Sequence, residues 1–315
     1  MFVTIKYEGN MKLVNLIAPR FTIRRLYLSI LRDFIYRPSS IFGRLSQTNF
    51  KNNLICRDLI IHCNICGETG YVYYDFPDIY IRKEHSIGLL RETLRCKSCG
   101  STMRDRQMAF GILQEIARRF AIKFLSLAEY RKNPSGTIRI LDSDSYSPIN
   151  RILRGLDNYN YSQYIPNLPN GDRLSDDSIV VDLMNIPFDE KSFDLILSSD
   201  VMEHVADDNA AHKSIFRTLD RGGVYIFTVP FDPTALKNRK LTVSTDNANA
   251  SSHLYLDRHV HGDPHSSSGV TAHRIYGHQL IQDLINEGFA TDFITVHEPR
   301  TGIYEGDLFI ARKEI

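Results

Sequence analysis

The most informative part of the chain reads Val181-Asp-Leu-Met-Asn-Ile-Pro-Phe-Asp-Glu-Lys-Ser-Phe-Asp-Leu-Ile-Leu-Ser-Ser-Asp-Val-Met-Glu-His-Val205. Short apolar runs at 179–182 and 193–198 lie on either side of a turn that contains Pro187. Runs of this length between turn signals are typical of buried strands. We therefore expect two strands here, with Asp182 at the end of the first and Ser198-Ser199 at the end of the second.

Strand and helix signals alternate on both sides of this stretch. We expect strands at 137–141, 161–165 and 224–230, helices at 149–156 and 208–219, and a last helix at 276–287 before closing strands at 293–297 and 307–311. Gly222 and Gly288 are expected to take the left-handed position after two of these helices. Alternating strands and helices imply a mostly parallel sheet with right-handed crossovers. The predicted fold class is therefore α/β, with a Rossmann-like, mostly parallel seven-stranded sheet.

The segment from Asp182 to Pro230 resembles the core of class I S-adenosylmethionine-dependent methyltransferases of the small-molecule type. The matching positions, in order, are Asp182, Leu183, Pro187-Phe188, Ser192-Phe-Asp194, Glu203-His204-Val205, Gly222-Gly223 and Pro230. The resemblance implies S-adenosylmethionine bound at the carboxyl ends of the strands, where ligands of open α/β sheets lie. It also implies that Asp182 accepts from the adenine amino group and that the Leu183 amide reads a ring nitrogen. Ser198 and Ser199 would lie along the methionine portion. An alternative role for Asp182 is to cap the following turn.

The first loop departs from the family pattern. The family has a glycine-rich loop after its first strand, whereas this chain has Asp142-Ser143-Asp144-Ser145, without glycine. We expect the small serines to let the cofactor approach and Asp142 to order the loop, so that Asp142, Ser143 and Ser145 are cofactor-binding candidates. The acidic residue that binds the ribose after the second strand is also missing, and Asn167 or Asn170 is a candidate substitute. An inactive, methyltransferase-like binding module is the alternative that these losses leave open.

Methyl transfer needs alignment and, for a protonated nucleophile, a base. His204 is the candidate base, and packing beside Glu203 is its alternative role. Asp200 to His204 also resembles a Mg²⁺- or Mn²⁺-binding pattern of some RNA methyltransferases. Histidines are frequent between 253 and 278, and a solvated loop is the plain interpretation of most of them: His253, His259, His261, His265, His273 and His278. His273, Arg274 and Tyr276 resemble an "HxRxYG" segment and are the candidates for the substrate edge.

Four cysteines form two tight pairs, Cys63-x-x-Cys66 and Cys96-x-x-Cys99, each followed by a glycine. Two such pairs in one chain are typical of a structural Zn²⁺ site with four thiolates. The intervening β-branched and aromatic residues predict short strands, as in a zinc ribbon, and a helical pattern follows from 103 to about 130. Cys56 is left over. We expect the zinc-ribbon module and its linking helix at 55–133 and the methyltransferase domain at 134–315.

The first 51 residues carry nine Lys/Arg against two acidic residues, a net charge of +7 in a chain of +1. We expect residues 1–54 to be a basic amphipathic segment with a helix at about 22–36, either packed on the protein or lying on anionic lipid. The overall charge gives no general case for nucleic acid, although a nucleic-acid methyltransferase is a third candidate. No stretch is long and apolar enough for a membrane span, and a signal sequence is not apparent. We expect a cytoplasmic enzyme whose acceptor is a small molecule or saccharide; the sequence does not indicate its oligomeric state.

Overall fold

The computed structural model describes residues 3–7, 10–14, 55–74, 90–134, 136–240, 260–263 and 266–314. Within the basic N-terminal segment it describes only strands β1 (Val3–Tyr7) and β2 (Asn10–Val14), which pair antiparallel. The helix expected at 22–36 lies outside the described residues, and so do His253, His259 and His265. The proposed roles of these residues remain predictions.

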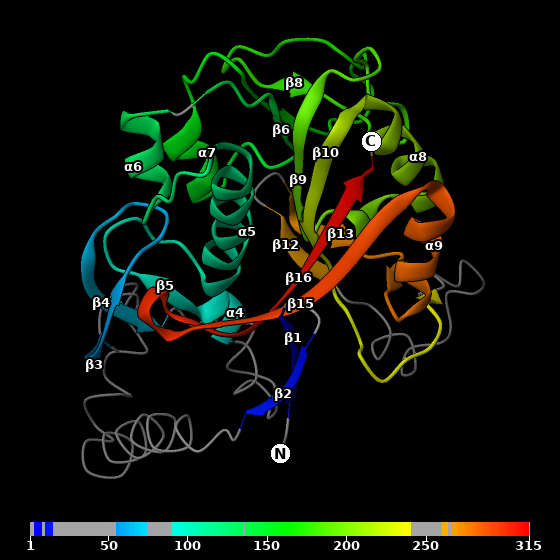
Figure 1. Cartoon of the computed structure of the whole chain (residues 1–315). Helices are drawn as coiled ribbons and strands as arrows, with labels where there is room; N and C mark the ends of the chain where they lie inside the picture. The colour runs from blue at the N-terminus through cyan, green and yellow to red at the C-terminus, as the bar shows by residue number, and fades with distance from the viewer. Residues whose placement is uncertain are drawn as a thin grey trace, which may run out of the picture.

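A seven-stranded sheet forms the centre of the molecule (Figure 1). Its order is β15 (Phe289–Glu298), β16 (Ile303–Lys313), β10 (Leu219–Thr228), β9 (Phe193–Ser199), β6 (Ile140–Asp142), β7 (Tyr159–Gln163) and β8 (Ile179–Val180). The five strands from β10 to β8 are parallel to one another, and β16 runs antiparallel to both β10 and β15. The predicted Rossmann-like, mostly parallel seven-stranded sheet is confirmed.

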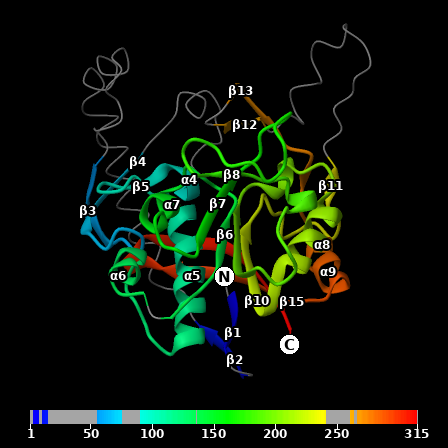
Figure 2. The same cartoon turned by 90° about the horizontal axis from the view of Figure 1, so that it is seen from above.

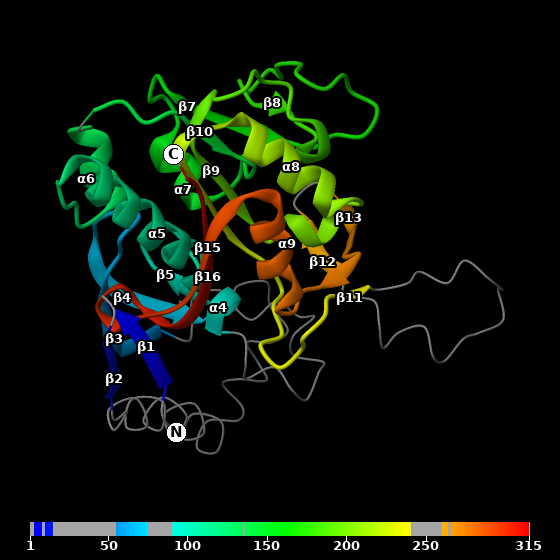
Figure 3. The same ribbon diagram turned by 45° about the vertical axis from the view of Figure 1, so that its right-hand side comes forward.

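Helices cover both faces of the sheet, as the views in Figures 2 and 3 show. Helices α5 (Met103–Phe120) and α7 (Pro148–Leu153) lie on one face, and α8 (Asp208–Thr218) and α9 (Gln279–Glu287) lie on the other. Side chains of β9 alternate between the two layers: Leu195 and Leu197 pack with α5, and Ile196 packs with α8. Because both faces are buried, the strand reads as a continuous apolar run in the sequence.

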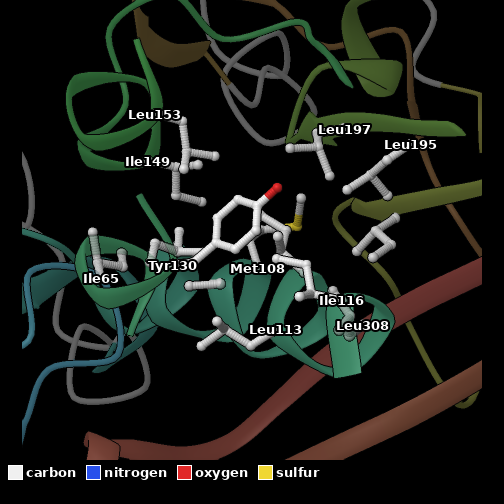
Figure 4. Packing of buried hydrophobic residues seen from close by; sticks show 14 of the residues in the cluster. Ile65, Met108, Leu113, Ile116, Tyr130, Ile149, Leu153, Leu195, Leu197 and Leu308 are labelled. Atoms are coloured by element: carbon white, nitrogen blue, oxygen red, sulfur yellow. The ribbon is translucent and has the colours of Figure 1, made fainter. Parts of the chain in front are cut away.

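The α5 layer is closely packed against the sheet. A Cβ atom at Gly111 of α5 would lie 2.9 Å from Leu308 Cδ2 and 3.0 Å from Ile226 Cγ2, so a larger residue would push the helix outward. Figure 4 shows the same layer from close by, with β9, α5 and α7 contributing Leu195, Leu197, Met108, Leu113, Ile116, Ile149 and Leu153. Helix α5 therefore packs on the sheet although it precedes the domain boundary predicted at 133/134; that boundary remains a prediction.

The cysteine-bearing part forms a small antiparallel sheet of β3 (Ile55–His62), β4 (Thr69–Tyr74) and β5 (Leu94–Cys96), with the short helix α4 (Leu90–Thr93) leading into β5. Arg106 of α5 is fully buried and holds this part to the rest. Its guanidinium donates to the carbonyls of Ser101 (2.6 Å), Leu94 (3.2 Å) and Gly302 (3.2 Å), the last of which follows the turn η5 (Pro299–Thr301) between β15 and β16. We call residues 55–74 and 90–102 the cysteine module.

Short elements complete the described part. The turns η3 (Leu183–Asn185) and η4 (Met202–His204) follow β8 and β9, and α6 (Leu127–Lys132) follows α5. Strand β11 (Arg239–Lys240) pairs with β14 (Arg274–Ile275), and β12 (Val260–Asp263) pairs with β13 (Ser266–Thr271). Among the described helices, none has the length and apolar character that crossing a membrane requires.

Two expectations about helix ends need correction. Helix α8 ends at Thr218 and passes through an extended Leu219 (φ −70°, ψ 138°) directly into β10, so Gly222 does not cap it. Gly222 is left-handed (φ 69°) but lies in an irregularity of β10. The helical pattern at 103–130 is two helices, because Ala121 turns left-handed (φ 54°) after α5. Gly288 (φ 105°) caps α9 as predicted.

Candidate functional site

The carboxyl ends of the parallel strands bring the predicted cofactor-binding residues to one edge of the sheet. At the end of β6 the Asp142 carboxylate accepts from the Asp144 backbone N–H (3.0 Å) and from the Tyr159 hydroxyl (2.6 Å). Burial, together with the charge of Asp144, raises the pKa of Asp142 to about 8. Asp142 thus holds the first loop in shape, and its contact with a cofactor stays a prediction.

Ser143 and Ser145 lie in this glycine-free loop. Their hydroxyl oxygens are buried and have no hydrogen-bond partner among the described residues. No residue from Asp142 to Ser147 has a positive φ, so the loop does not need glycine for its backbone shape. Ser147 ends the loop by capping α7 through the Asn150 N–H (3.0 Å). The two serines therefore place free hydroxyl groups at the end of the first strand.

Asp182 lies where β8 passes into η3 and caps that turn. Its Oδ1 accepts from the Met184 N–H (2.9 Å), and its own N–H donates to Asn170 Oδ1 (3.0 Å). The second carboxylate oxygen makes no hydrogen bond among the described residues. Leu183, which follows, is buried. The capping role is thus observed; it leaves one oxygen of Asp182 for a ligand. Asn170 braces the same turn by donating to the Asn185 carbonyl (2.6 Å).

Ser198 and Ser199 end β9 and point into opposite layers. The Ser198 hydroxyl pairs with the Tyr225 hydroxyl (2.6 Å) and is buried on the α8 side of the sheet. The Ser199 hydroxyl and carbonyl both accept from Arg104 Nη1, at 2.7 and 3.2 Å. Ser198 is therefore engaged inside the protein, while Ser199 lies on the edge that Arg104 reaches.

Gln163, at the end of β7, was not among the residues predicted from the sequence. Its Nε2 donates to the Ser178 hydroxyl (2.7 Å), and its Oε1 is buried without a partner in the described part of the chain. Gln163 is the last residue of β7, the second strand of the large sheet in chain order, and the family has its ribose-binding acidic residue just after that strand. The end of this strand could therefore have indicated Gln163, whereas the sequence prediction named Asn167 and Asn170. Asn167 is left-handed, with φ 70°.

Beyond β9 the chain turns through Asp200 into η4. Arg91 of α4 donates to both oxygens of Asp200, at 2.6 and 2.7 Å, and Asp200 has a left-handed backbone (φ 52°). Burial alone would raise the pKa of Asp200, but the charges of Arg91 and Arg104 lower it below its usual value. A carboxylate held by two arginines is not a free ligand for a metal, so the Mg²⁺ or Mn²⁺ alternative gains no support.

Glu203 in η4 is fully buried, and neither carboxylate oxygen has a hydrogen-bond partner among the described residues. Burial, together with the nearby charge of Asp200, raises its pKa to about 8. His204, the predicted base, is half-buried with Nε2 3.8 Å from Glu203 Oε1. His204 thus lies in the turn that follows β9 at this edge of the sheet; its catalytic role stays a prediction.

The three residues predicted for the substrate edge lie against η4. His273 is exposed, and its N–H donates to the Glu203 carbonyl (2.6 Å). Arg274 is buried, donates to the Ala206 carbonyl (2.7 Å) and pairs with Asp208 (3.0 Å). The hydroxyl of the buried Tyr276 donates to the Met202 carbonyl (3.0 Å). Arg274 and Tyr276 thus brace the turn from inside, and of the three only the side chain of His273 is exposed.

The four cysteines converge in the cysteine module. Their Sγ atoms all lie within 4.8 Å of one another, with 3.8 Å between Cys63 and Cys99 and 3.9 Å between Cys66 and Cys96. Gly67 (φ 78°) and Gly100 (φ 73°) are left-handed, and their N–H groups close each knuckle onto the first cysteine of its pair at 2.8 Å. Sulfur atoms in a disulfide are about 2.05 Å apart, so these are four thiols arranged around one point.

Comparison with known proteins agrees with this fold. Residues 163–227 match the family model described as "Methyltransferase domain". No curated protein matches the chain. The solved structures that it resembles include the [4+2]-cyclase SpnF, at 16% identity over 67% of this chain and 82% of that one (TM-score 0.37). They also include an S-adenosylmethionine-dependent methyltransferase from Methanosarcina mazei, at 15% identity over 58% of this chain and 96% of that one (TM-score 0.33). Another is the S-adenosylmethionine-dependent methyltransferase from Mesorhizobium loti, at 17% identity over 56% of this chain and 91% of that one (TM-score 0.34).

All three scores are below 0.5, so we rest the assignment on the family match and on the observed sheet. The matched segment begins at the end of β7 and runs through β10, across most of the carboxyl edge described above. Residues 163–227 thus match a methyltransferase domain, and the sheet that contains them has the Rossmann-like order of class I methyltransferases. A four-cysteine module that fits a zinc ribbon precedes it.

Proposed function

We propose that the protein is an S-adenosylmethionine-dependent methyltransferase that acts on a small-molecule or saccharide-type acceptor. The observation that carries this proposal is a set of buried polar atoms that follow the carboxyl ends of β6, β7 and β9 and have no partner among the described residues. These atoms are Ser143 Oγ, Ser145 Oγ, Gln163 Oε1, Glu203 Oε1 and Glu203 Oε2. Leaving a polar atom buried and unpaired costs about 1–3 kcal/mol. A ligand at this edge would supply the missing partners, and this is the edge where open α/β sheets bind their ligands.

The residues present fit the cofactor. The free oxygen of Asp182 would accept from the adenine amino group beside Leu183, and Gln163 with Asn170 would face the ribose hydroxyls. Ser143 and Ser145 would contact the part of the cofactor that lies over the loop after β6. S-adenosylmethionine, when bound, supplies an electrophilic methyl group on its sulfonium. The chain then has to align the acceptor and remove its proton, and His204 is the candidate to take that proton.

The charges at this edge favour a neutral acceptor. Arg91 and Arg104, which reach the end of β9, are each paired with a carboxylate, Asp200 and Glu92 respectively. Binding to nucleic acid draws its free energy largely from unpaired lysines and arginines that contact phosphates. A nucleic-acid acceptor therefore has less support than a small molecule or saccharide. A cytoplasmic location and a lipid contact of the basic N-terminal segment belong to this proposal as expectations from the sequence.

The cysteine module would hold one structural Zn²⁺. Zinc–thiolate bonds of about 2.3 Å in a tetrahedron put sulfur atoms roughly 3.8 Å apart, which agrees with the observed 3.8 and 3.9 Å. Four thiolates fill the coordination sphere, so this metal would have no catalytic position. Cys96→Ser should release the metal, whereas the matched change Cys56→Ser should leave it bound. Metal analysis of the purified variants tests this, and stoichiometric zinc in Cys96→Ser would contradict it.

The cofactor is tested by calorimetry on the zinc-loaded protein. We expect one S-adenosylmethionine or S-adenosylhomocysteine per chain, and a mass-resolved assay of a metabolite extract should then show one acceptor gaining a methyl group. A folded, zinc-loaded protein that ignores both compounds at millimolar concentration would support the alternative of an inactive binding module.

A further inference from the structure

Two arginines of the cysteine-module side reach the end of β9 and hold it. Arg91 pairs with both oxygens of Asp200, and Arg104 Nη1 donates to the hydroxyl and carbonyl of Ser199. Glu92 joins them: it accepts from Arg104 at 2.8 and 3.0 Å and from Arg91 at 2.9 Å. These side chains are only 14–25% exposed. We call Arg91, Glu92 and Arg104 the arginine clamp.

The clamp is continuous with the second cysteine knuckle. Arg91 lies in α4, which runs into β5 and Cys96; Arg104 lies in the first turn of α5, which follows Cys99. The knuckle between them is closed by backbone bonds from Cys96 N–H to the Ser101 carbonyl and from Gly100 N–H to the Cys96 carbonyl, both 2.8 Å. Helices α4 and α5 lie side by side in Figures 1 and 2. A change in the knuckle would therefore displace both arginines.

The clamp acts on a strained turn. Asp200 has φ 52°, a left-handed conformation that is unfavourable for residues other than glycine. Thr228 also holds it, through a hydroxyl bond of 2.8 Å to Asp200 Oδ1. This turn sets the direction of the chain from Ser199 into η4, and so the positions of Glu203 and His204. The clamp thus fixes the part of the edge where the methionine portion of the cofactor is proposed to lie.

The charges show that the clamp is no ligand-binding arginine pair. Its two guanidinium groups face the carboxylates of Glu92 and Asp200, so the set is neutral. An anion could reach either arginine only by displacing a carboxylate that is already held at 2.6–3.0 Å. The arginines are therefore suited to holding the turn rather than to binding an anion.

We propose that Arg91 and Arg104 are positioning residues that couple metal binding in the cysteine module to cofactor binding at the end of β9. The coupling rests on the proposed function, because it needs a cofactor at this edge. With metal bound, the knuckle holds the clamp, and the clamp holds the Asp200 turn in the shape that accepts the cofactor. Since linkage is reciprocal, cofactor binding must then tighten metal binding by the same factor.

The first experiment measures S-adenosylhomocysteine affinity by calorimetry in zinc-loaded variants. Arg91→Ala should weaken binding roughly tenfold while keeping one zinc per chain, since a bidentate charge-assisted pair is lost. Asp200→Gly accepts the left-handed turn without strain, so Arg91→Ala added to Asp200→Gly should weaken binding less than about threefold. Arg118→Ala, which removes a half-exposed arginine of α5 away from the clamp, is the control and should bind as the natural protein does. If Arg91→Ala is unstable, Arg91→Lys, which keeps the charge but loses the bidentate geometry, takes its place.

The second experiment measures zinc affinity by competition with a chelator, with and without saturating S-adenosylhomocysteine. In the natural protein the ligand should raise zinc affinity about tenfold; in Arg91→Ala, saturated to the same degree, it should raise it less than about threefold. Equal increases in both proteins would show that the ligand acts through overall stability, and would overturn the coupling. Arg91→Ala with unchanged ligand affinity would do the same while leaving the proposed function intact. If the natural protein itself does not bind the ligand, the proposed function has failed.

Discussion

Two buried glutamates show how the two ends of the sheet differ. Glu115 of α5, 1% exposed, accepts from Arg118, Arg119 and Arg312 at 2.6–2.9 Å. Glu203, 0% exposed at the carboxyl edge, accepts from no group in the described part of the chain. Burial raises the pKa of both, but for Glu115 the arginines outweigh it and the pKa is lowered, whereas that of Glu203 rises to about 8.

The difference extends to the surroundings of each glutamate. Near Glu115, Arg119 also donates to Asp194 and to the Gly222 carbonyl. Its guanidinium group therefore links the amino end of β9 to β10 through paired groups. At the carboxyl end, the hydroxyls of Ser143 and Ser145 also have no partner within the part of the chain that the structure describes. The buried glutamate at the amino end is thus fully paired. At the carboxyl end the arginine clamp is paired as well, but Glu203 and the two serines beside it have no partner among the described residues. The proposed ligand edge lies at the end that holds these unpaired atoms.

The largest effect is expected at the paired end. Glu115→Gln keeps the shape of the side chain but removes the charge that three arginines share. Breaking a buried ion pair on one side costs about 3–5 kcal/mol, so we expect a loss of that order in the free energy of unfolding. Urea unfolding at neutral pH measures it, with the exposed change Glu190→Gln as control. A loss below about 1 kcal/mol would mean that Glu115 is no more engaged than a surface residue.

At the carboxyl end, replacing the buried glutamate should raise the free energy of unfolding instead of lowering it. The folded-state pKa of Glu203 is about 8, well above roughly 4.3 in an unfolded chain. Between these values the folded state holds a proton that the unfolded state has released, so stability falls as pH rises, by up to about 1.4 kcal/mol per unit. Glu203→Gln should therefore stabilise the ligand-free protein by about 2–3 kcal/mol at pH 7.

The measurement is urea unfolding at pH 5.5, 6.5 and 7.5. Asp142, whose pKa is also raised to about 8, contributes a slope of the same sign, so Glu203→Gln should reduce the pH dependence without abolishing it. An unchanged slope in Glu203→Gln would show that water or a nearby group already satisfies this carboxylate.

The sequence predicted best those features of the fold that depend on residues close together in the chain. The strand predicted at 193–198 and the helix ended by Gly288 follow from local patterns, namely the length of an apolar run and a glycine at a left-handed position. Both are confirmed, the strand as β9 (Phe193–Ser199). The same local rule was wrong at Gly222, because α8 passes into β10 through Leu219 without needing a left-handed residue. Ala121 ended α5 with no glycine or proline to signal it.

The candidate site was harder to predict, because its residues meet across the fold. Arg91 and Asp200 are 109 positions apart in the chain, and no periodicity or motif marks such a pair. Glu203 belongs to the family-like pattern in the sequence, but its lack of partners among the described residues is a property of the packed structure. What the sequence did indicate was the edge itself, since Asp142, Asp182 and Ser199 each end a strand, and parallel strands end on the same side.

The smallest effect tests how Asp182 divides its two oxygens. One oxygen caps η3 by accepting from Met184, and the other is the proposed partner of the adenine amino group. Asp182→Asn keeps an oxygen for the cap and, when that oxygen is used, presents only an amide donor toward adenine, whereas Asp182→Ala removes both roles. We expect both variants to bind S-adenosylhomocysteine about 1–2 kcal/mol more weakly, or roughly 5- to 30-fold. Only Asp182→Ala should also lose about 1 kcal/mol of stability from the missing cap.

Calorimetry and urea unfolding on the same samples separate the two roles. If Asp182→Asn binds as tightly as the natural protein, the second oxygen does not contact the cofactor, and capping is the whole role of Asp182.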